Sequence, residues 1–179
     1  INHREILRGI LDAVEIEEEK QTDALVALDK LDKIGKDGVL KEFVHRKINE
    51  NAGIKLLDLF TLLETSGNTN SLSQLAEFIG DQTNGKEGLK ALAQILEFTD
   101  LENIKIDASL ARGLSYYNGT IVEINVPDLA GSLAGGGRYD GLIGMFGKEQ
   151  IPACGLSIGL ERILVVMEER GMFPEDLQQ

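Results

Sequence analysis

The sequence changes in character near residue 104, and this break limits the folds that the chain can adopt. Residues 17–103 are charged, rich in leucine and poor in aromatic side chains, whereas the residues that follow are rich in glycine and alternate between apolar and polar types. Apolar residues in the first part recur at helical spacing, and Gly and Asn residues separate the apolar segments. We therefore expect four or five short amphipathic helices, followed by an antiparallel sheet.

The segments on either side of this helical block complete the predicted architecture. Residues 1–16 have apolar side chains at helical spacing and predict a further short helix. Residues 104–110 and 116–126 alternate as strands do, residues 152–159 form an apolar strand, and residues 159–171 form a helix. The expected buried face of that last helix consists of Leu160, Ile163, Leu164 and Met167. Strands and helices do not alternate regularly, so a Rossmann fold is excluded.

Composition narrows the class of protein. The chain has 179 residues, 42% of them apolar, without an apolar run of membrane-spanning length, so we expect a soluble, globular protein. The single cysteine, Cys154, lies in an apolar run and predicts a buried structural thiol. His3 and His45 are far apart in the sequence, which argues against a histidine metal cluster. A net charge of −12 disfavours strong non-specific binding of nucleic acid.

The stretch ARGLSYYNGTIVEI, residues 111–124, carries the first candidate site residues. Arg112 offers a planar fork of donors that suits phosphate or carboxylate oxygens. Tyr116 and Tyr117 have flat apolar rings with a hydroxyl, which suits the walls of a pocket for a small polar ligand. In a strand the two rings would point to opposite faces, so only one, Tyr117 by preference, would line the pocket. The alternative is a hairpin with Asn118-Gly119 as its turn and Arg112 in solvent.

Two glycine-rich segments follow. In AGGGRYDGLIGMFG, residues 134–147, Gly135 and Gly136 would let a ligand approach the backbone closely, and Tyr139 comes soon after them. This segment is not a phosphate-binding P-loop, which requires a different spacing. In GLSIGLERI, residues 155–163, a strand flanked by Gly159 leads into a helix with Arg162 in its first turn. A cation is disfavoured there, so either a nearby anionic ligand or the neighbouring Glu161 would offset its cost.

Taken together and in this order, the three segments resemble those of the histidyl-tRNA synthetase family, which belongs to the class II aminoacyl-tRNA synthetases. ARGLSYYNGTIVE is similar to the first histidine-specific signature, AGGGRYDGLIGMFG to the second, and GLSIGLERI to class II motif 3. The resemblance implies an α+β fold, namely part of a class II antiparallel sheet with an inserted α-helical domain. Residues 1–16 would follow motif 2, residues 17–103 would be the insertion, and residues 104–179 would complete the catalytic segment.

The resemblance also implies a role for each candidate residue. Arg112 would be catalytic, contacting the histidine carboxylate and the α-phosphate of ATP as the adenylate forms. Gly159 and Arg162 would bind ATP. Histidine would be bound by Tyr116, Tyr117, Tyr139, Gly135 and Gly136. Mg²⁺ would accompany ATP, and no metal bound by the protein itself is expected. The full-length enzyme would also bind tRNA(His) and would be a homodimer. It would be located in the cytoplasm and would not contact a membrane.

The sequence also departs from the family pattern. Ser115 occupies the position of the usual aspartate, and motifs 1 and 2 and the anticodon-binding domain have no counterpart in these residues. We therefore expect the 179-residue chain to be inactive by itself. Two alternatives stay open: a paralogue that does not aminoacylate, such as the regulatory subunit of ATP phosphoribosyltransferase, and a helical module that binds a protein or tRNA.

Overall fold

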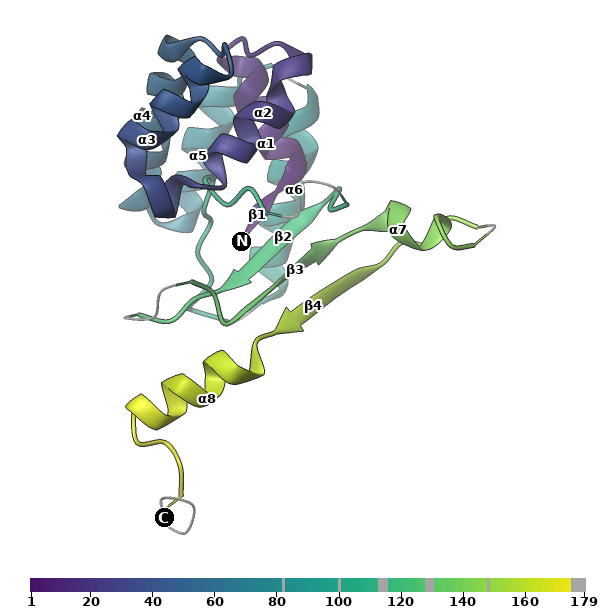
Figure 1. The fold of residues 1–179 in the computed structure, drawn as a ribbon. Helices are drawn as coiled ribbons and strands as arrows, with labels where there is room; N and C mark the ends of the chain where they lie inside the picture. Colours follow the sequence, from purple (N-terminus) through teal and green to yellow (C-terminus); the bar gives the residue numbers. More distant parts are fainter. Residues whose placement is uncertain (82, 100, 113–115, 128–130, 148, 175–179) are drawn as a thin grey trace.

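The fold was analysed in a computed structural model, which describes the whole chain except residues 82, 100, 113–115, 128–130, 148 and 175–179. Its first part is a bundle of helices (Figure 1). After the short strand β1 (Asn2–His3), the helices are α1 (Arg4–Ala13), α2 (Glu18–Leu28), α3 (Leu31–His45), α4 (Glu50–Glu64), α5 (Asn68–Ile79) and α6 (Thr83–Phe98). The predicted N-terminal helix is thus confirmed, and residues 17–103 contain five helices within the described part.

Side chains and glycines fix how the bundle begins and packs. His3 caps α1, because its Nδ1 accepts a hydrogen bond from the backbone N–H of Glu5 at 3.2 Å. α1 packs mainly on α6 and α5. Where α1 and α6 cross, a Cβ on Gly9 would lie 2.9 Å from the Cα of Gly85, so the absence of side chains brings the two backbones together.

The second part is a four-stranded antiparallel sheet in the order β1-β2-β3-β4. Its longer strands are β2 (Thr120–Ile124), β3 (Ala134–Arg138) and β4 (Cys154–Ile158), followed by α8 (Leu160–Glu169); a short helix, α7 (Asp140–Gly144), precedes β4. β1 pairs with the first two residues of β2, Ile121 lying opposite Asn2 and Thr120 opposite His3. The expected α+β class with an antiparallel sheet is therefore observed.

One continuous core joins the helices to the sheet. It contains the buried faces of α1 to α6 together with Ile106, Ala108 and Ala111 from the connecting segment and Ile121 from β2. α6 packs against β1 and β2. The helical block and the strand that follows the Arg112 segment are therefore positioned by the same packed interior.

Two asparagines and Ile1 hold the segment that leads to Arg112. The N–H of Asp107 donates to the carbonyl of Ile1 at 2.9 Å, and the terminal amine of Ile1 donates to the carbonyl of Lys105 at 2.6 Å. Residues 104–110 alternate in burial as predicted, but they form no regular strand. Asn68, at the start of α5, donates from Nδ2 to the carbonyl of Ile104 at 2.7 Å and accepts from the N–H of Ile106 at 2.8 Å. Asn2 is fully buried and donates from Nδ2 to the carbonyls of Ala108 at 3.2 Å and Leu110 at 3.0 Å. Side-chain amides satisfy backbone groups here that a strand would satisfy by pairing.

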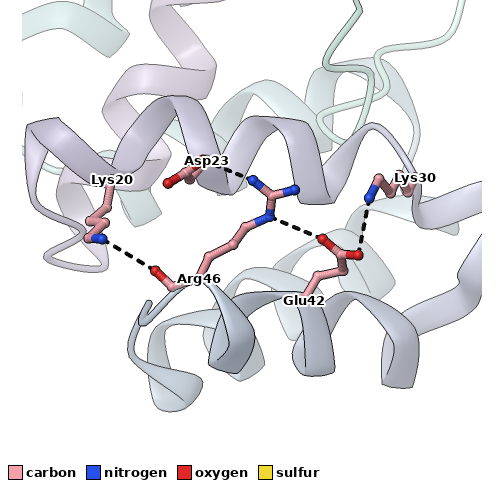
Figure 2. A network of polar contacts seen from close by, with 5 residues as sticks. All are labelled: Lys20, Asp23, Lys30, Glu42 and Arg46. Carbon is pink, nitrogen blue, oxygen red and sulfur yellow. Dashed lines mark hydrogen bonds and ion pairs between the residues drawn. The ribbon is translucent and has the colours of Figure 1, made fainter.

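A network of charged side chains ties α2 to α3 (Figure 2). Arg46, which caps the C-terminus of α3, contacts Asp23 of α2 at 2.8 Å and Glu42 of α3 at 3.0 Å. Glu42 also pairs with Lys30 at 3.1 Å, and Lys20 donates to the carbonyl of Arg46 at 3.4 Å. Hydrogen bonds from Lys30 and then Arg46 hold the pKa of Glu42 below its usual value.

Two expectations for the C-terminal part were wrong. Cys154 is exposed, not buried, because β4 is the last strand of the described sheet and most of its residues face solvent. On α8, Leu160 is 68% and Leu164 43% exposed, and Val166 is the buried residue of the helix. Figure 1 shows α8 beyond β4, on the side away from the helical bundle. The apolar spacing predicted the helix correctly, but the apolar face of α8 that carries Leu160 and Leu164 is not packed against other described residues.

None of the helices in the described ranges has both the length and the apolar character needed to cross a membrane.

Candidate functional site

The predicted site residues meet around one pocket. This pocket has a volume of about 340 Å³, and segments far apart in the sequence form its wall. Of the predicted residues, it is lined by Arg112, Tyr116, Tyr117, Gly135, Gly136, Gly159 and Arg162. The remaining lining residues lie on β2, on β4, at the start of β3 and in the segment just before it. Tyr139 is the one predicted site residue that does not line the pocket. Its ring stacks on that of Tyr117, which does.

Arg112 enters this pocket from the segment that Asn2 anchors. Its side chain is 47% exposed, and its Nε forms an ion pair with Oε2 of Glu123 on β2. The Glu123 side chain is only 7% exposed. Arg112 is thus partly in solvent, as in the hairpin alternative, but its Nε is paired with a buried carboxylate.

The three tyrosines of the chain form one cluster. The rings of Tyr116 and Tyr117 are 4.4 Å apart between centroids at an interplanar angle of 60°, and Tyr139 lies 6.2 Å from each of them. The expectation that Tyr116 and Tyr117 face opposite ways was wrong, because β2 begins only at Thr120 and both tyrosines precede it. Without a pleat the two rings can share one side, and both line the pocket.

The glycines beside the tyrosines make room for them and for the neighbouring strand. A Cβ at Gly155 would collide with the hydroxyl of Tyr139, and one at Gly137 would lie 3.0 Å from the ring of Tyr117. A Cβ at Gly136 would collide with the backbone carbonyl of Gly155 on β4. Gly135 has more space, since its Cβ would lie 3.7 Å from the carbonyl oxygen of Val122. Gly136 is therefore needed for close strand pairing, whereas Gly135 leaves its space to the pocket.

A set of polar contacts fixes the backbone on both sides of Tyr139. The Nε of Arg138 donates to both carboxylate oxygens of Asp140 at 2.9 Å. Asn118 accepts from the N–H of Asp140 at 3.2 Å and donates its own N–H to the carbonyl of Arg138 at 3.0 Å. These bonds connect the end of the first predicted signature with the second.

Arg162 closes the pocket from the start of α8. A Cβ at Gly159, the residue before the helix, would lie 3.3 Å from the Cδ of Arg162. At Gly131, with φ of 86°, a Cβ would lie 2.6 Å from its Nη1. The guanidinium thus extends from α8 over the segment that precedes β3. Together with Arg112 it places two guanidinium groups on one pocket, an arrangement suited to an anionic ligand.

A second, larger cavity of about 740 Å³ adjoins the first. It lies between the ends of α2 and α6, the segment of residues 101–112 and β2, and Glu123 lines it. Arg112 and Val122 line both cavities, so they form the wall between them.

Two residues that hold Arg112 were not identified from the sequence. Asn2 belongs to none of the three segments singled out for candidate site residues, and Glu123 enters only as part of the alternating residues 116–126. The alternation places Glu123 on the same face of β2 as the buried Ile121, which marks an acidic residue at an interior position. Ser115 lies outside the described residues. Within the described ranges, no three His, Cys, Asp or Glu side chains are grouped so that they could hold a metal ion.

Comparison with known proteins relates this geometry to a family. A sequence profile described as histidyl-tRNA synthetase matches residues 1–163. A histidine–tRNA ligase of Flavobacterium johnsoniae is 41% identical over 182 residues, which cover 98% of this chain and 38% of that protein. The crystal structure of histidyl-tRNA synthetase from Nostoc sp. PCC 7120 has a TM-score of 0.83 at 28% identity, with 97% of this chain and 42% of that one covered.

A second similar structure shows the same fold. It is described as an ATP phosphoribosyltransferase regulatory subunit/histidyl-tRNA synthetase from Bacillus halodurans and has a TM-score of 0.72 at 22% identity. The chain spans about two fifths of the length of the relatives that it matches.

Proposed function

The chain belongs to the histidyl-tRNA synthetase family, and from this premise we propose that it is part of a cytoplasmic enzyme that activates histidine with ATP and transfers it to tRNA(His). The observation that supports this proposal is the single pocket on which Arg112, Tyr117, Gly135 and Arg162 converge. The enzyme acts as a homodimer in this proposal. Residues 1–16 and 104–179 belong to its catalytic domain, and residues 17–103 form an insertion that contributes to tRNA binding.

The chemistry of Arg112 suits the activation step. A carboxylate oxygen of histidine attacks the α-phosphorus of ATP; the new P–O bond forms, the bond to the bridging oxygen breaks, and pyrophosphate leaves. Both reactants are anionic, so a fixed cation between them lowers the barrier. The guanidinium of Arg112 supplies this charge, and its partner Glu123 keeps it at the pocket.

The other pocket residues divide between the two substrates. Tyr116, Tyr117 and Tyr139 form the wall for the histidine side chain, and Gly135 and Gly136 allow the substrate to approach the strand. Arg162 stacks on the adenine and contacts the phosphates of ATP, with Gly159 providing the close approach. Mg²⁺ accompanies ATP as part of the substrate.

The test is histidine-dependent exchange of pyrophosphate into ATP by the full-length parent enzyme. We expect Arg112→Ala to lower the exchange rate by about 100- to 1000-fold, the usual effect of removing one stabilising group from a developing charge. Arg8→Ala is the matched control, because Arg8 lies on the exposed side of α1 and pairs there with Glu5. Exchange by Arg112→Ala at the wild-type rate would contradict the assignment of Arg112.

The same assay separates the proposed enzyme from a regulatory paralogue. A regulatory subunit would bind histidine without forming an adenylate, so histidine binding without exchange by the parent would reject the proposed function. The 179-residue chain itself should show no exchange, because nucleotide geometry depends on groups elsewhere in the parent.

A further inference from the structure

The ion pair between Arg112 and Glu123 is unusual in how unequally its two partners are exposed. The Glu123 side chain is 7% exposed, whereas that of Arg112 is 47% exposed. Within the described residues, Oε2 of Glu123 is buried and has no hydrogen-bond partner, although it faces the Arg112 guanidinium. A buried carboxylate is costly unless a cation compensates it. Glu123 therefore depends on Arg112 and attracts it strongly.

The position of Glu123 on β2 lets it hold Arg112 at the pocket. β1 pairs with β2 only at Thr120 and Ile121, and the segment before Arg112 is hydrogen-bonded to Asn2 on that side. Val122 and Glu123 are neighbours in β2 and so point to opposite faces. Arg112 and Val122 line both cavities, and Glu123 lines the larger one.

We propose that Glu123 is a positioning residue for the proposed adenylation step, which binds the Nε of Arg112 so that the guanidinium stays directed at the pocket. This inference rests on the proposed function of Arg112. Glu123 is ion-paired with the guanidinium at its Nε end, and four of the five N–H groups of an arginine are on Nη1 and Nη2. With Nε held by Glu123, the two terminal nitrogens remain for the carboxylate and the phosphate.

The proposal differs from a purely structural role in what it predicts for the reaction. A structural ion pair would contribute to the folded state, and its loss would lower the thermal midpoint while each folded molecule kept its rate. A positioning residue acts through Arg112, so its loss lowers the rate of each active site even when folding is intact. Misplacement of a catalytic group by about 1 Å can cost about 100-fold in rate.

The experiment uses the full-length parent, with kcat for histidine-dependent pyrophosphate exchange expressed per titrated active site. Glu123→Gln keeps the shape of the side chain and removes its charge. We expect it to lower kcat by about 10- to 100-fold, with the KM for ATP changed by less than about threefold. Glu123→Asp keeps the charge on a shorter side chain and should give an intermediate kcat; it also serves as the test if Glu123→Gln does not fold.

Two controls make the result specific. Glu5→Gln removes a carboxylate from another Arg–Glu pair, Arg8–Glu5 at 3.2 Å on α1, and should leave kcat unchanged. In an Arg112→Ala background, Glu123→Gln should change the single-turnover rate by less than about twofold, because residues that act as one unit are not additive.

The outcomes distinguish the inference from the proposed function. If Arg112→Ala is impaired but Glu123→Gln reacts at the wild-type rate, or if their effects are additive, the positioning role is wrong and the function of Arg112 stands. If Arg112→Ala itself reacts at the wild-type rate, both are wrong.

Discussion

The ring of Tyr139 stacks on that of Tyr117, with centroids 6.2 Å apart and an interplanar angle of 29°. Tyr116 packs at an angle against both rings, so all three tyrosines of the chain meet. The hydroxyl of Tyr139 fills the space above Gly155, and the ring of Tyr117 lies against Gly137. The aromatic wall of the pocket is therefore built jointly by the two signature segments and by two glycines that leave room for it.

Because of this packing, the phenol of Tyr117 should ionise only at a higher pH than usual. Burial and then a hydrogen bond with Tyr116 raise the pKa of Tyr117 to about 12, with smaller contributions from the charges of Tyr116 and Tyr139. Ultraviolet titration of the folded chain should therefore show one phenol that ionises late. Tyr117→Phe should remove this late step, and Tyr116→Phe should move it to lower pH.

The same shift has a consequence for stability at high pH. The pKa of Tyr117 is higher in the folded than in the unfolded chain, so the folded state holds the proton more tightly. Its contribution to stability is complete below pH ~10 and is lost as the pH rises from ~10 to ~12. Unfolding measurements across this range should show a steeper loss for the wild type than for Tyr117→Phe. Equal slopes would contradict the shift.

The glycines of β3 should differ sharply in tolerance. A Cβ on Gly136 would collide with the backbone carbonyl of Gly155, which cannot move without breaking the β3–β4 pairing, whereas a Cβ on Gly135 would meet the nearest atom at 3.7 Å. We expect Gly136→Ala to lower the free energy of unfolding by about 1–3 kcal/mol. Gly135→Ala, the matched control, should unfold close to the wild type. Denaturant unfolding measures both, and similar losses would contradict the packing described here.

Much of the architecture could be predicted from the sequence because local patterns determine it. Helical spacing predicted α1 and α8 and four or five helices in residues 17–103, and the alternating and apolar segments predicted β2 and β4; β3 lies in the glycine-rich segment, to which no strand was assigned. The segments ARGLSYYNG, AGGGRYDG and GLSIGLER were also expected to act together. Seven of the predicted site residues line one pocket, although their individual roles stay predictions.

The failures have a common physical cause, because burial and orientation depend on tertiary contacts. Tyr116 and Tyr117 were assigned to a strand, but β2 starts after them, so strand alternation did not apply. Cys154 and Leu160 lie in apolar runs, yet β4 and α8, which carry them, are largely exposed within the described residues. Asn2 and Glu123 gave no recognisable motif. The partners of Asn2 lie more than 100 positions away, and Arg112, the partner of Glu123, lies outside β2 in a segment without regular structure.

The network between α2 and α3 should stabilise the bundle in a salt- and pH-dependent way. Glu42 accepts from both Lys30 and Arg46, and these bonds lower its pKa. A carboxyl with a lowered folded pKa stabilises the fold above its unfolded value, and this contribution is lost as the pH falls through the folded pKa. Glu42→Gln should therefore melt at a lower temperature than the wild type at neutral pH.

The difference between Glu42→Gln and the wild type should shrink in two conditions. Salt at about 1 M screens half-exposed charges, and acid below the folded pKa neutralises Glu42. Asp58→Asn, on an exposed position in the middle of α4, is the control and should melt close to the wild type in all three conditions. A melting difference that persists unchanged in high salt would mean that Glu42 acts through packing and not through its charge.

Asn2 offers a test of how the fold positions Arg112. Its buried amide donates to the carbonyls of Ala108 and Leu110, immediately before Arg112. Asn2→Ala would leave both carbonyls without this donor, which should cost about 2–3 kcal/mol of unfolding free energy. Asn51→Ala, an exposed asparagine on α4, should cost little. In the full-length parent, Asn2→Ala should also lower the exchange rate per active site, because the segment that carries Arg112 loses its anchor. Loss of stability with an unchanged rate per site would show that Asn2 holds the fold together without setting the place of the guanidinium.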